Sequence, residues 1–279
     1  MTQNHQSPQP LRNAPLQDIA LQLFLILFLV AIFAGFVDSI AGGGGLIVLP
    51  AMLIMGIPPL EALGTNKLQA QFGSASATIA YARKGHVDLK KQFPMAFMAF
   101  VGGIFGALTA SYVPPDILRA IMPFLLIAIA IYFAFKPNLS DIDSHRRITP
   151  FLFGLTAVPL VGFYDGIFGP GAGSFYMLAF VWLAGFGMLK ATAHTKLLNL
   201  GSNFGSFLIF TVNGAIMWKL GIVMGLGQFI GAQLGSRLAM SNGANIIRPL
   251  LVISCIAMAT KLLIDAGALA WIGARVFGL

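Results

Sequence analysis

Long uninterrupted apolar stretches constrain this chain more than any other feature of its sequence. A helix needs roughly 20 predominantly apolar residues to span a bilayer. The stretches that approach this length are residues 19–36, 93–113, 117–135, 151–168, 197–212, 220–234 and 246–264. Only 9% of the 279 residues are charged, against about 25% in a typical soluble chain. We therefore predict an all-α polytopic membrane protein with about 8–10 membrane segments.

The charges and the single cysteine exclude several classes of protein. The net charge of +8 does not indicate nucleic-acid binding, because the lysines and arginines lie mainly at segment ends, where membrane topology requires them. Cys255 lies in an apolar stretch without a second cysteine, so we interpret it as a packing residue. The chain has neither a His-Glu-x-x-His motif nor a Gly-x-x-x-x-Gly-Lys-[Ser/Thr] phosphate loop. We therefore expect no metal, no cofactor and no enzymatic activity.

The sequence repeats itself. The segment GFVDSIAGGGG is followed by GFYDGIFGPGAG, and Asp165 lies 127 positions after Asp38. The segment FVGGIFGALTA matches FIGAQLGSRLA at an offset of 129, and the same offset relates Lys67 to Lys196. Agreement at separated places predicts an internal duplication.

Basic residues in the loops predict that the two halves are inverted. The loop 83–91 carries four lysines and arginines, so the positive-inside rule places it in the cytoplasm together with the linker 136–149. The matching loop of the second half, 213–219, carries one lysine. Inverted repeats with interrupted helices are a recurring architecture of secondary transporters. The predicted organisation is a polar N-terminal tail (1–18), a first membrane repeat (19–135), a cytoplasmic linker (136–149) and a second membrane repeat with a C-terminal segment (150–279).

Glycine clusters beside the two aspartates predict breaks within membrane helices. Glycine costs about 1 kcal/mol per residue relative to alanine in a helix, and non-helical backbone at membrane depth survives only inside protein or along a wet cavity. A helix that restarts there exposes N–H groups and a positive dipole end, which suit an anion. The glycines that we predict to contact a substrate are Gly43, Gly44, Gly45, Gly171 and Gly173. Close helix packing is the alternative, and it is our interpretation of the Gly-x-x-x-Gly pairs at 102–106 and 231–235.

Two lysines follow these breaks. Thr65 or Asn66 resembles an N-cap, which would place Lys67 in a first helical turn, and Thr195 and Lys196 follow the same pattern. A lysine in a first turn opposes the helix dipole, so a bound anion would explain it. The alternatives are a lysine that extends to the membrane surface or pairs with a carboxylate. The predicted substrate contacts on these helices are Asn66, Lys67, Thr195, Lys196 and Asn199.

Asp38 and Asp165 are carboxylates in apolar surroundings, which makes them functional candidates. Three roles stay open for them. They can carry a proton for coupling, balance the lysine charges, or accept hydrogen bonds from the N–H groups of their own helix break.

The paired Gly-Phe-x-Asp segments with their glycine clusters, together with the motif GTNKL at residues 64–68, resemble the TauE/SafE family. The resemblance covers about residues 20–265. It implies a permease of the bacterial plasma (inner) membrane for small sulfur-containing anions such as sulfite, sulfoacetate or another organosulfonate. His194 stands in the second half where Thr65 stands in the first, so the two half-sites need not contact the substrate equally.

Residues and resemblance together predict one mechanism. Interrupted helices from two inverted halves meet near the membrane midplane, hold a small anion, and expose it to either side by rocking, with proton coupling left open. An anion channel is the alternative, and a membrane enzyme or signalling partner without transport is a third. The expected partners are a small anionic substrate and the lipid bilayer, with no nucleic acid, and a homodimer is left open.

Overall fold

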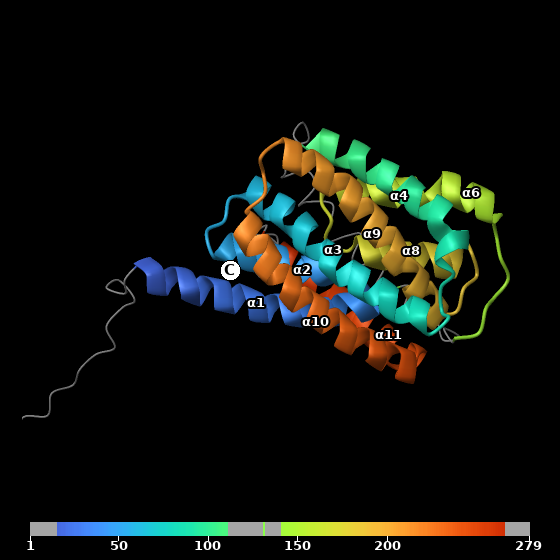
Figure 1. Cartoon of the computed structure of the whole chain (residues 1–279). Helices are drawn as coiled ribbons and strands as arrows, with labels where there is room; N and C mark the ends of the chain where they lie inside the picture. Colours follow the sequence, from blue (N-terminus) through green and yellow to red (C-terminus); the bar gives the residue numbers. More distant parts are fainter. Residues whose placement is uncertain (1–15, 111–130, 132–140, 266–279) are drawn as a thin grey trace, which may run out of the picture.

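The computed structural model describes residues 16–110, 131 and 141–265, and the elements in these ranges are all α-helices (Figure 1). The predicted all-α class is confirmed. The predicted first half contains α1 (Leu16–Ala41), α2 (Gly44–Ile54), α3 (Pro59–Arg83) and α4 (Leu89–Ala110). The second contains α6 (Pro150–Leu155), α7 (Ala157–Ile167), α8 (Ala172–Trp182), α9 (Met188–Val212), α10 (Trp218–Asn242) and α11 (Ala244–Asp265). Most of the predicted segment 117–135 and most of the polar tail lie outside the described residues.

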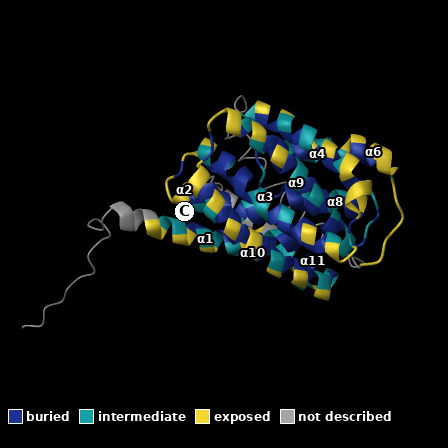
Figure 2. Cartoon of the chain, viewed as in Figure 1, coloured by how far each residue is buried: buried dark blue, intermediate teal, exposed yellow. Residues whose placement is uncertain are grey.

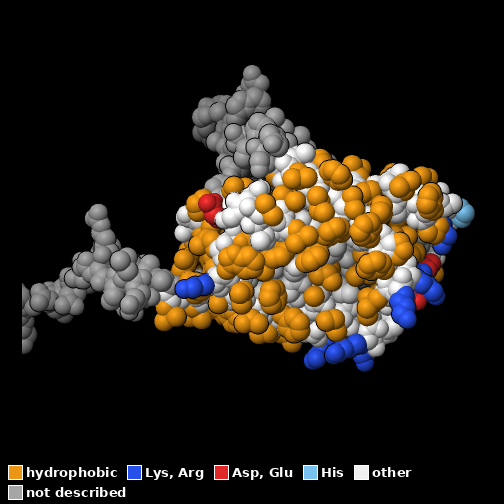
Figure 3. All heavy atoms as spheres, turned by 45° about the horizontal axis from the view of Figure 1, so that its top comes forward, with side chains coloured by type: hydrophobic (Ala, Val, Ile, Leu, Met, Phe, Trp, Pro, Cys, Tyr) orange, Lys and Arg blue, Asp and Glu red, His pale blue; other side chains and the backbone are white. Residues whose placement is uncertain are grey.

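The outer surface of this helix bundle is apolar, as a lipid environment requires. Among the described residues, helices long and apolar enough to cross a membrane occupy Leu21–Ala41, Leu89–Ala110 and Pro150–Ile167. Large side chains such as Phe33 and Phe105 are more than half exposed. Hydrophobic atoms cover most of the face shown in Figure 3, and the lysines and arginines lie toward its ends. The chain is therefore a membrane protein.

Small residues let four of the long helices approach closely in two pairs. A Cβ at Gly106 of α4 would collide with the Phe163 carbonyl of α7, and one at Gly231 of α10 would collide with the Ile32 carbonyl of α1. Both Gly-x-x-x-Gly pairs therefore serve helix packing, as predicted. Each contact joins a helix of one predicted half to a helix of the other. Two similar halves that pack their helices against each other would produce this pairing.

The helices α3 and α9 lie at the centre of the bundle, where most of their residues are buried (Figure 2), and they run in opposite directions. The hydroxyl of Thr65, early in α3, accepts a hydrogen bond of 3.0 Å from the backbone N–H of Met217, just beyond α9. At the other end of the bundle, Lys91, in the helix that follows α3, lines one pocket with His194, early in α9, and with Arg146 of the linker. Inverted halves require this antiparallel arrangement. The duplication itself and the cytoplasmic side stay predictions.

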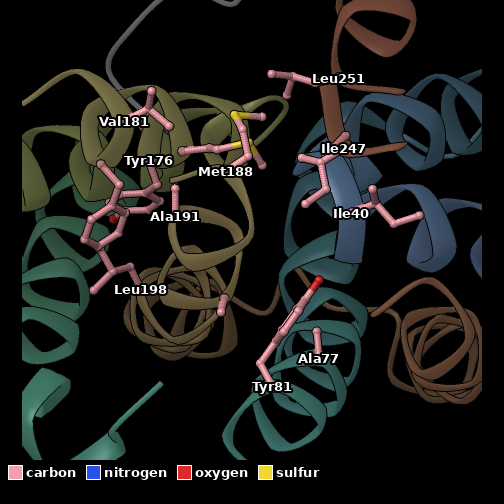
Figure 4. Close-up of a cluster of buried hydrophobic side chains, with 14 of the residues drawn as sticks. Ile40, Ala77, Tyr81, Tyr176, Val181, Met188, Ala191, Leu198, Ile247 and Leu251 are labelled. Atoms are coloured by element: carbon pink, nitrogen blue, oxygen red, sulfur yellow. The ribbon is translucent and has the colours of Figure 1, made fainter. Parts of the chain in front are cut away.

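The largest buried hydrophobic cluster holds the two halves together. It brings side chains of α1, α3, α8, α9 and α11 into one core (Figure 4). Two fully buried tyrosines in it have hydrogen bonds for their hydroxyl groups: Tyr81 donates to the Ser39 carbonyl (3.0 Å) and Tyr176 to that of Val158 (3.3 Å). These bonds matter because an unpaired buried hydroxyl would cost about 1–3 kcal/mol.

Candidate functional site

Both predicted interruptions are present in the structure. The first lies between α1, which ends at Ala41, and α2, which begins at Gly44. The second lies between α7 and α8, across residues 168–171. The backbone of Gly42 has φ +80° and that of Gly169 φ +86°, a left-handed conformation that glycine adopts without steric cost. The two restarted helices, α2 and α8, each have eleven residues.

The two breaks touch each other. A Cβ at Gly42 would lie 2.6 Å from the backbone nitrogen of Ser174, and one at Gly173 would lie 2.5 Å from Cα of Gly42. The Ser174 hydroxyl donates a hydrogen bond of 3.0 Å to the carbonyl of Ala41, so it joins the start of α8 to the end of α1. The starts of α2 and α8 therefore meet inside the bundle, and glycine is required because the backbones leave no room for a side chain.

Lys67 of α3 forms a buried ion pair with Asp165 of α7. Its Nζ lies 2.7 Å from Oδ1 of Asp165 and also donates to the backbone carbonyl of that residue. The second carboxylate oxygen accepts a hydrogen bond of 2.5 Å from the hydroxyl of Ser202 in α9. The Lys67 side chain is fully buried and that of Asp165 is 3% exposed. Both oxygens of this carboxylate therefore have partners.

Lys196 of α9 forms the corresponding pair with Asp38 of α1, but with a looser geometry. Its Nζ donates to the Asp38 backbone carbonyl and lies 3.7 Å from Oδ2 of the same residue. The other oxygen, Oδ1, accepts a hydrogen bond of 3.0 Å from the N–H of Gly44, the first residue of α2. The carboxylate thus also satisfies an N–H group of its own helix break. The Asp38 side chain is 14% exposed, whereas that of Lys196 is fully buried.

Each lysine therefore pairs with the aspartate of the other predicted half. The structure shows two of the roles left open by the sequence: both aspartates balance the lysine charges, and Asp38 in addition accepts from its helix break, while proton coupling stays a prediction. Two ammonium groups and two carboxylates leave the buried centre without net charge. Pairing also explains how four ionisable groups are tolerated among apolar helices, since unpaired buried charges are far more costly.

The predicted position of the lysines at helix starts is wrong. The helix α3 begins at Pro59 and α9 at Met188, so Lys67 and Lys196 lie inside helices of 25 residues. Proline is favoured at the first helical position, and the acidic Glu61 in the first turn complements the dipole. Thr65 and its neighbours resemble caps but lie on a buried helical face.

Two of the predicted polar contacts, Asn66 and Asn199, lie close to the helix starts. A Cβ at Gly173 would lie 2.9 Å from the amide nitrogen of Asn199, and one at Gly45 would lie 3.5 Å from that of Asn66. Among the described residues, the buried Oδ1 of Asn199 and Oγ1 of Thr195 have no hydrogen-bond partner. Leaving such groups unpaired costs about 1–3 kcal/mol each. The hydroxyl of Thr195 can therefore donate to a water or a ligand, whereas Oδ1 of Asn199 can accept from one.

The remaining predicted glycines lie at the helix starts themselves. Gly43 is the N-cap of α2, with φ −110°, and Gly171 is the N-cap of α8, with φ +81°. Neither helix has a side-chain cap, so their first N–H groups depend on other partners. No group of three or more metal-binding side chains occurs among the residues that were described.

Comparison with known proteins identifies the family. A family model described as "Sulfite exporter TauE/SafE" matches residues 27–262. The chain belongs to the TauE/SafE family. It is 65% identical over 250 residues to "Probable membrane transporter protein ORF9" of Sinorhizobium sp., covering 90% of this chain and 96% of that protein.

Two further TauE/SafE relatives are similar over nearly their whole length. Identity is 51% over 251 residues with "Probable membrane transporter protein YfcA" of Escherichia coli (strain K12), which covers 89% of this chain and 93% of that protein. Identity is 46% over 250 residues with "Probable membrane transporter protein" of Haemophilus influenzae, covering 90% and 98%. No solved structure matches the chain at a significant level.

Sequence reasoning missed several partners at the centre of this TauE/SafE chain. Ser202 was not recognised as a partner of Asp165, because its hydrogen bond to that residue depends on how α7 packs on α9. Ser174 was not recognised, although it joins the two breaks. The only available signal was a hydroxyl residue directly after a glycine cluster, which is too common to indicate a site.

Proposed function

We propose that this TauE/SafE chain is a secondary membrane transporter of small anions that works by alternating access. The observation that supports it best is the meeting of two interrupted helices beside two buried lysines. The starts of α2 and α8, which have no N-cap side chain, bring their first N–H groups and positive dipole ends to the contact between Gly42 and Gly173. Helix starts of this kind bind anions, and discontinuous helices at a repeat interface form the substrate sites of many transporters.

The electrostatic balance of the site supports a small anion rather than a cation. The two lysines are already balanced by two aspartates, so the side chains contribute no net charge. The helix starts add roughly half an elementary positive charge each. Asn66, Thr195 and Asn199 lie on the helices that face these starts and offer amide and hydroxyl donors. A bound oxyanion would accept from these groups and from the helix starts together.

The substrate class follows from the family rather than from the geometry. The matching model bears the name of a sulfite exporter, and sulfur oxyanions carry the negative charge that two helix starts favour. We therefore propose a small sulfur-containing anion, such as sulfite, sulfoacetate or another organosulfonate, as the substrate. We further propose the plasma membrane of a bacterium as the location, because the similar relatives come from bacteria.

The closed packing at the centre favours a carrier over an anion channel. Lys67 and Lys196 are fully buried, and the backbones of Gly42 and Gly173 are in contact. A conducting channel would need an open passage past these groups. A carrier instead passes through a state in which the site is closed, and rocking of one half against the other opens it to either side.

Counterflow in proteoliposomes tests this proposal. Vesicles are loaded with an excess of one unlabelled anion and diluted into a trace of the same labelled anion, using sulfite, sulfate, thiosulfate, methanesulfonate and sulfoacetate in turn, with acetate as the carboxylate control. A carrier accumulates label transiently, because each export of an unlabelled anion turns the site to the outside, where it binds the labelled anion. Saturable counterflow of at least one sulfur anion is expected. Uptake without counterflow would indicate a channel, and no uptake of any anion would refute transport.

A further inference from the structure

The two central ion pairs have the same residue types but different geometries. The distance between Nζ and the nearest carboxylate oxygen is 2.7 Å for Lys67 and Asp165, but 3.7 Å for Lys196 and Asp38. The Asp165 side chain is 3% exposed and the Asp38 side chain 14% exposed. If the two halves had equal roles, equal geometry would be expected. The difference indicates that the two pairs have different roles.

The pair of Lys67 and Asp165 is closed. One carboxylate oxygen binds the ammonium, the other binds Ser202, and the lysine also binds the Asp165 carbonyl. An ammonium with such close partners has little to gain from an additional anion. This pair therefore serves to fix α3 against α7 and α9.

The pair of Lys196 and Asp38 is open to change. Among the described residues, the partner of Asp38 Oδ2 is the Lys196 ammonium at 3.7 Å, and Oδ1 accepts from the N–H of Gly44. The ammonium is held mainly through the Asp38 backbone carbonyl, which no change in the carboxylate removes. If the carboxylate lost its charge, the Lys196 ammonium and the first N–H of α2 would both become available while the lysine stayed in place.

The other titratable groups around Asp38 do not supply a second cation. On α3, the phenol of Tyr81 donates a hydrogen bond of 3.0 Å to the carbonyl of Ser39, the residue after Asp38. The helix α2 has no titratable side chain, and the phenol of Tyr176 in α8 donates to the Val158 carbonyl. On α10, Lys219 is the second residue of the helix and Arg237 lies five residues before its end. Lys196 is thus the cation that contacts Asp38 among the described residues.

We propose that the substrate anion and one proton are taken up together at the pair of Asp38 and Lys196, while the pair of Lys67 and Asp165 stays closed. This rests on the proposed transport of anions. A proton from the water on the open side binds the Asp38 carboxylate and forms a neutral carboxylic acid. The anion takes the place of that carboxylate beside the Lys196 ammonium and the Gly44 N–H. A monovalent anion then enters with a proton, so the buried centre keeps its charge balance.

The pH dependence of anion binding to purified wild-type protein tests this step. The probe is thiosulfate or methanesulfonate, because neither titrates near neutral pH and any proton linkage must come from the protein. Uptake of one linked proton makes the apparent affinity fall roughly tenfold per pH unit on the alkaline side of the titration. In Asp38→Asn the neutral side chain is permanent, so binding is expected to persist with a flat pH profile. Asp165→Asn is the matched control and should keep the wild-type slope.

Proton movement itself gives a second readout that does not depend on the variants. In proteoliposomes that contain a trapped pH-sensitive dye, an inward methanesulfonate gradient is expected to acidify the lumen for wild type. A wild-type slope in Asp38→Asn, or a flat profile in a folded Asp165→Asn, would overturn the inference. Anion uptake without acidification would also overturn it and leave the proposed transport intact. A wild-type protein that neither binds nor transports any anion of the panel would refute both.

Discussion

Replacing Lys67 with methionine should destabilise the protein strongly. Methionine keeps most of the length and apolar character of the lysine stem but leaves the Asp165 carboxylate, 3% exposed, without its ammonium at 2.7 Å. Removing one partner of a buried pair costs about 3–5 kcal/mol, because the other charge stays buried and unpaired. For a chain of this size, that corresponds to a fall in melting temperature of roughly 6–20 °C. Thermal unfolding in detergent, followed by far-ultraviolet circular dichroism, measures it.

Two further variants test whether charge pairing explains this loss of stability. The double variant Lys67→Met with Asp165→Asn should recover much of the loss, because the amide is neutral and still binds Ser202. Lys196→Met should cost less than Lys67→Met, since Asp38 is 14% exposed and keeps the N–H of Gly44. The explanation by charge pairing would be refuted if Lys67→Met melted like wild type, or if the double variant melted no higher than the single one.

Three more predictions concern the helix breaks, the linker and the topology. Gly42→Ala should abolish transport because its Cβ would collide with α8, whereas Gly56→Ala, at the same positive φ but in open space, should lower only the melting temperature by a small amount; equal transport by the two variants would contradict this. The pKa of Asp143 is lowered from its usual value: burial raises it, but hydrogen bonds from a lysine of α9 and from the backbone N–H at the start of α9 lower it more. A lowered carboxyl pKa stabilises the fold at neutral pH, and that contribution disappears as the pH falls through the folded-state pKa. The difference in melting temperature between wild type and Asp143→Asn should therefore shrink in acid, and a constant difference would argue against it. Finally, single cysteines at Lys84 and Gly214, in a chain without the native cysteine, should react with an impermeant reagent from opposite sides of sealed vesicles; labelling of both from one side would refute the predicted topology.

The sequence by itself determined the helical class, the two interruptions and the closely packed glycine pairs. Each of these depends on local chemistry. In lipid a continuous apolar segment must satisfy its own backbone hydrogen bonds, and a run of glycines such as 42–45 weakens a helix wherever it occurs. The spacing of four residues places the two glycines of each pair on one helical face. Such features can be predicted without knowing what any helix packs against.

Helix boundaries near polar residues were not determined in the same way. Thr65 and Asn66 were interpreted as caps because caps are usually polar, yet they lie on a buried face of α3. Inside a membrane protein, polar residues also line the interior of the bundle, so the cap signal has two meanings. Only the packing of α3 shows which meaning applies.

The tertiary structure alone decided how the charges are paired. Lys67 lies 98 positions from Asp165, and Lys196 lies 158 positions from Asp38, so no spacing rule connects them. Crossing of the halves brings each lysine to the other half's aspartate. The difference between the pairs also comes from packing: α9 presents Ser202 to Asp165, whereas the start of α2 presents only the Gly44 N–H to Asp38. The two pairs have the same residue types, and their different neighbours make the pair of Lys67 and Asp165 close and the pair of Lys196 and Asp38 looser.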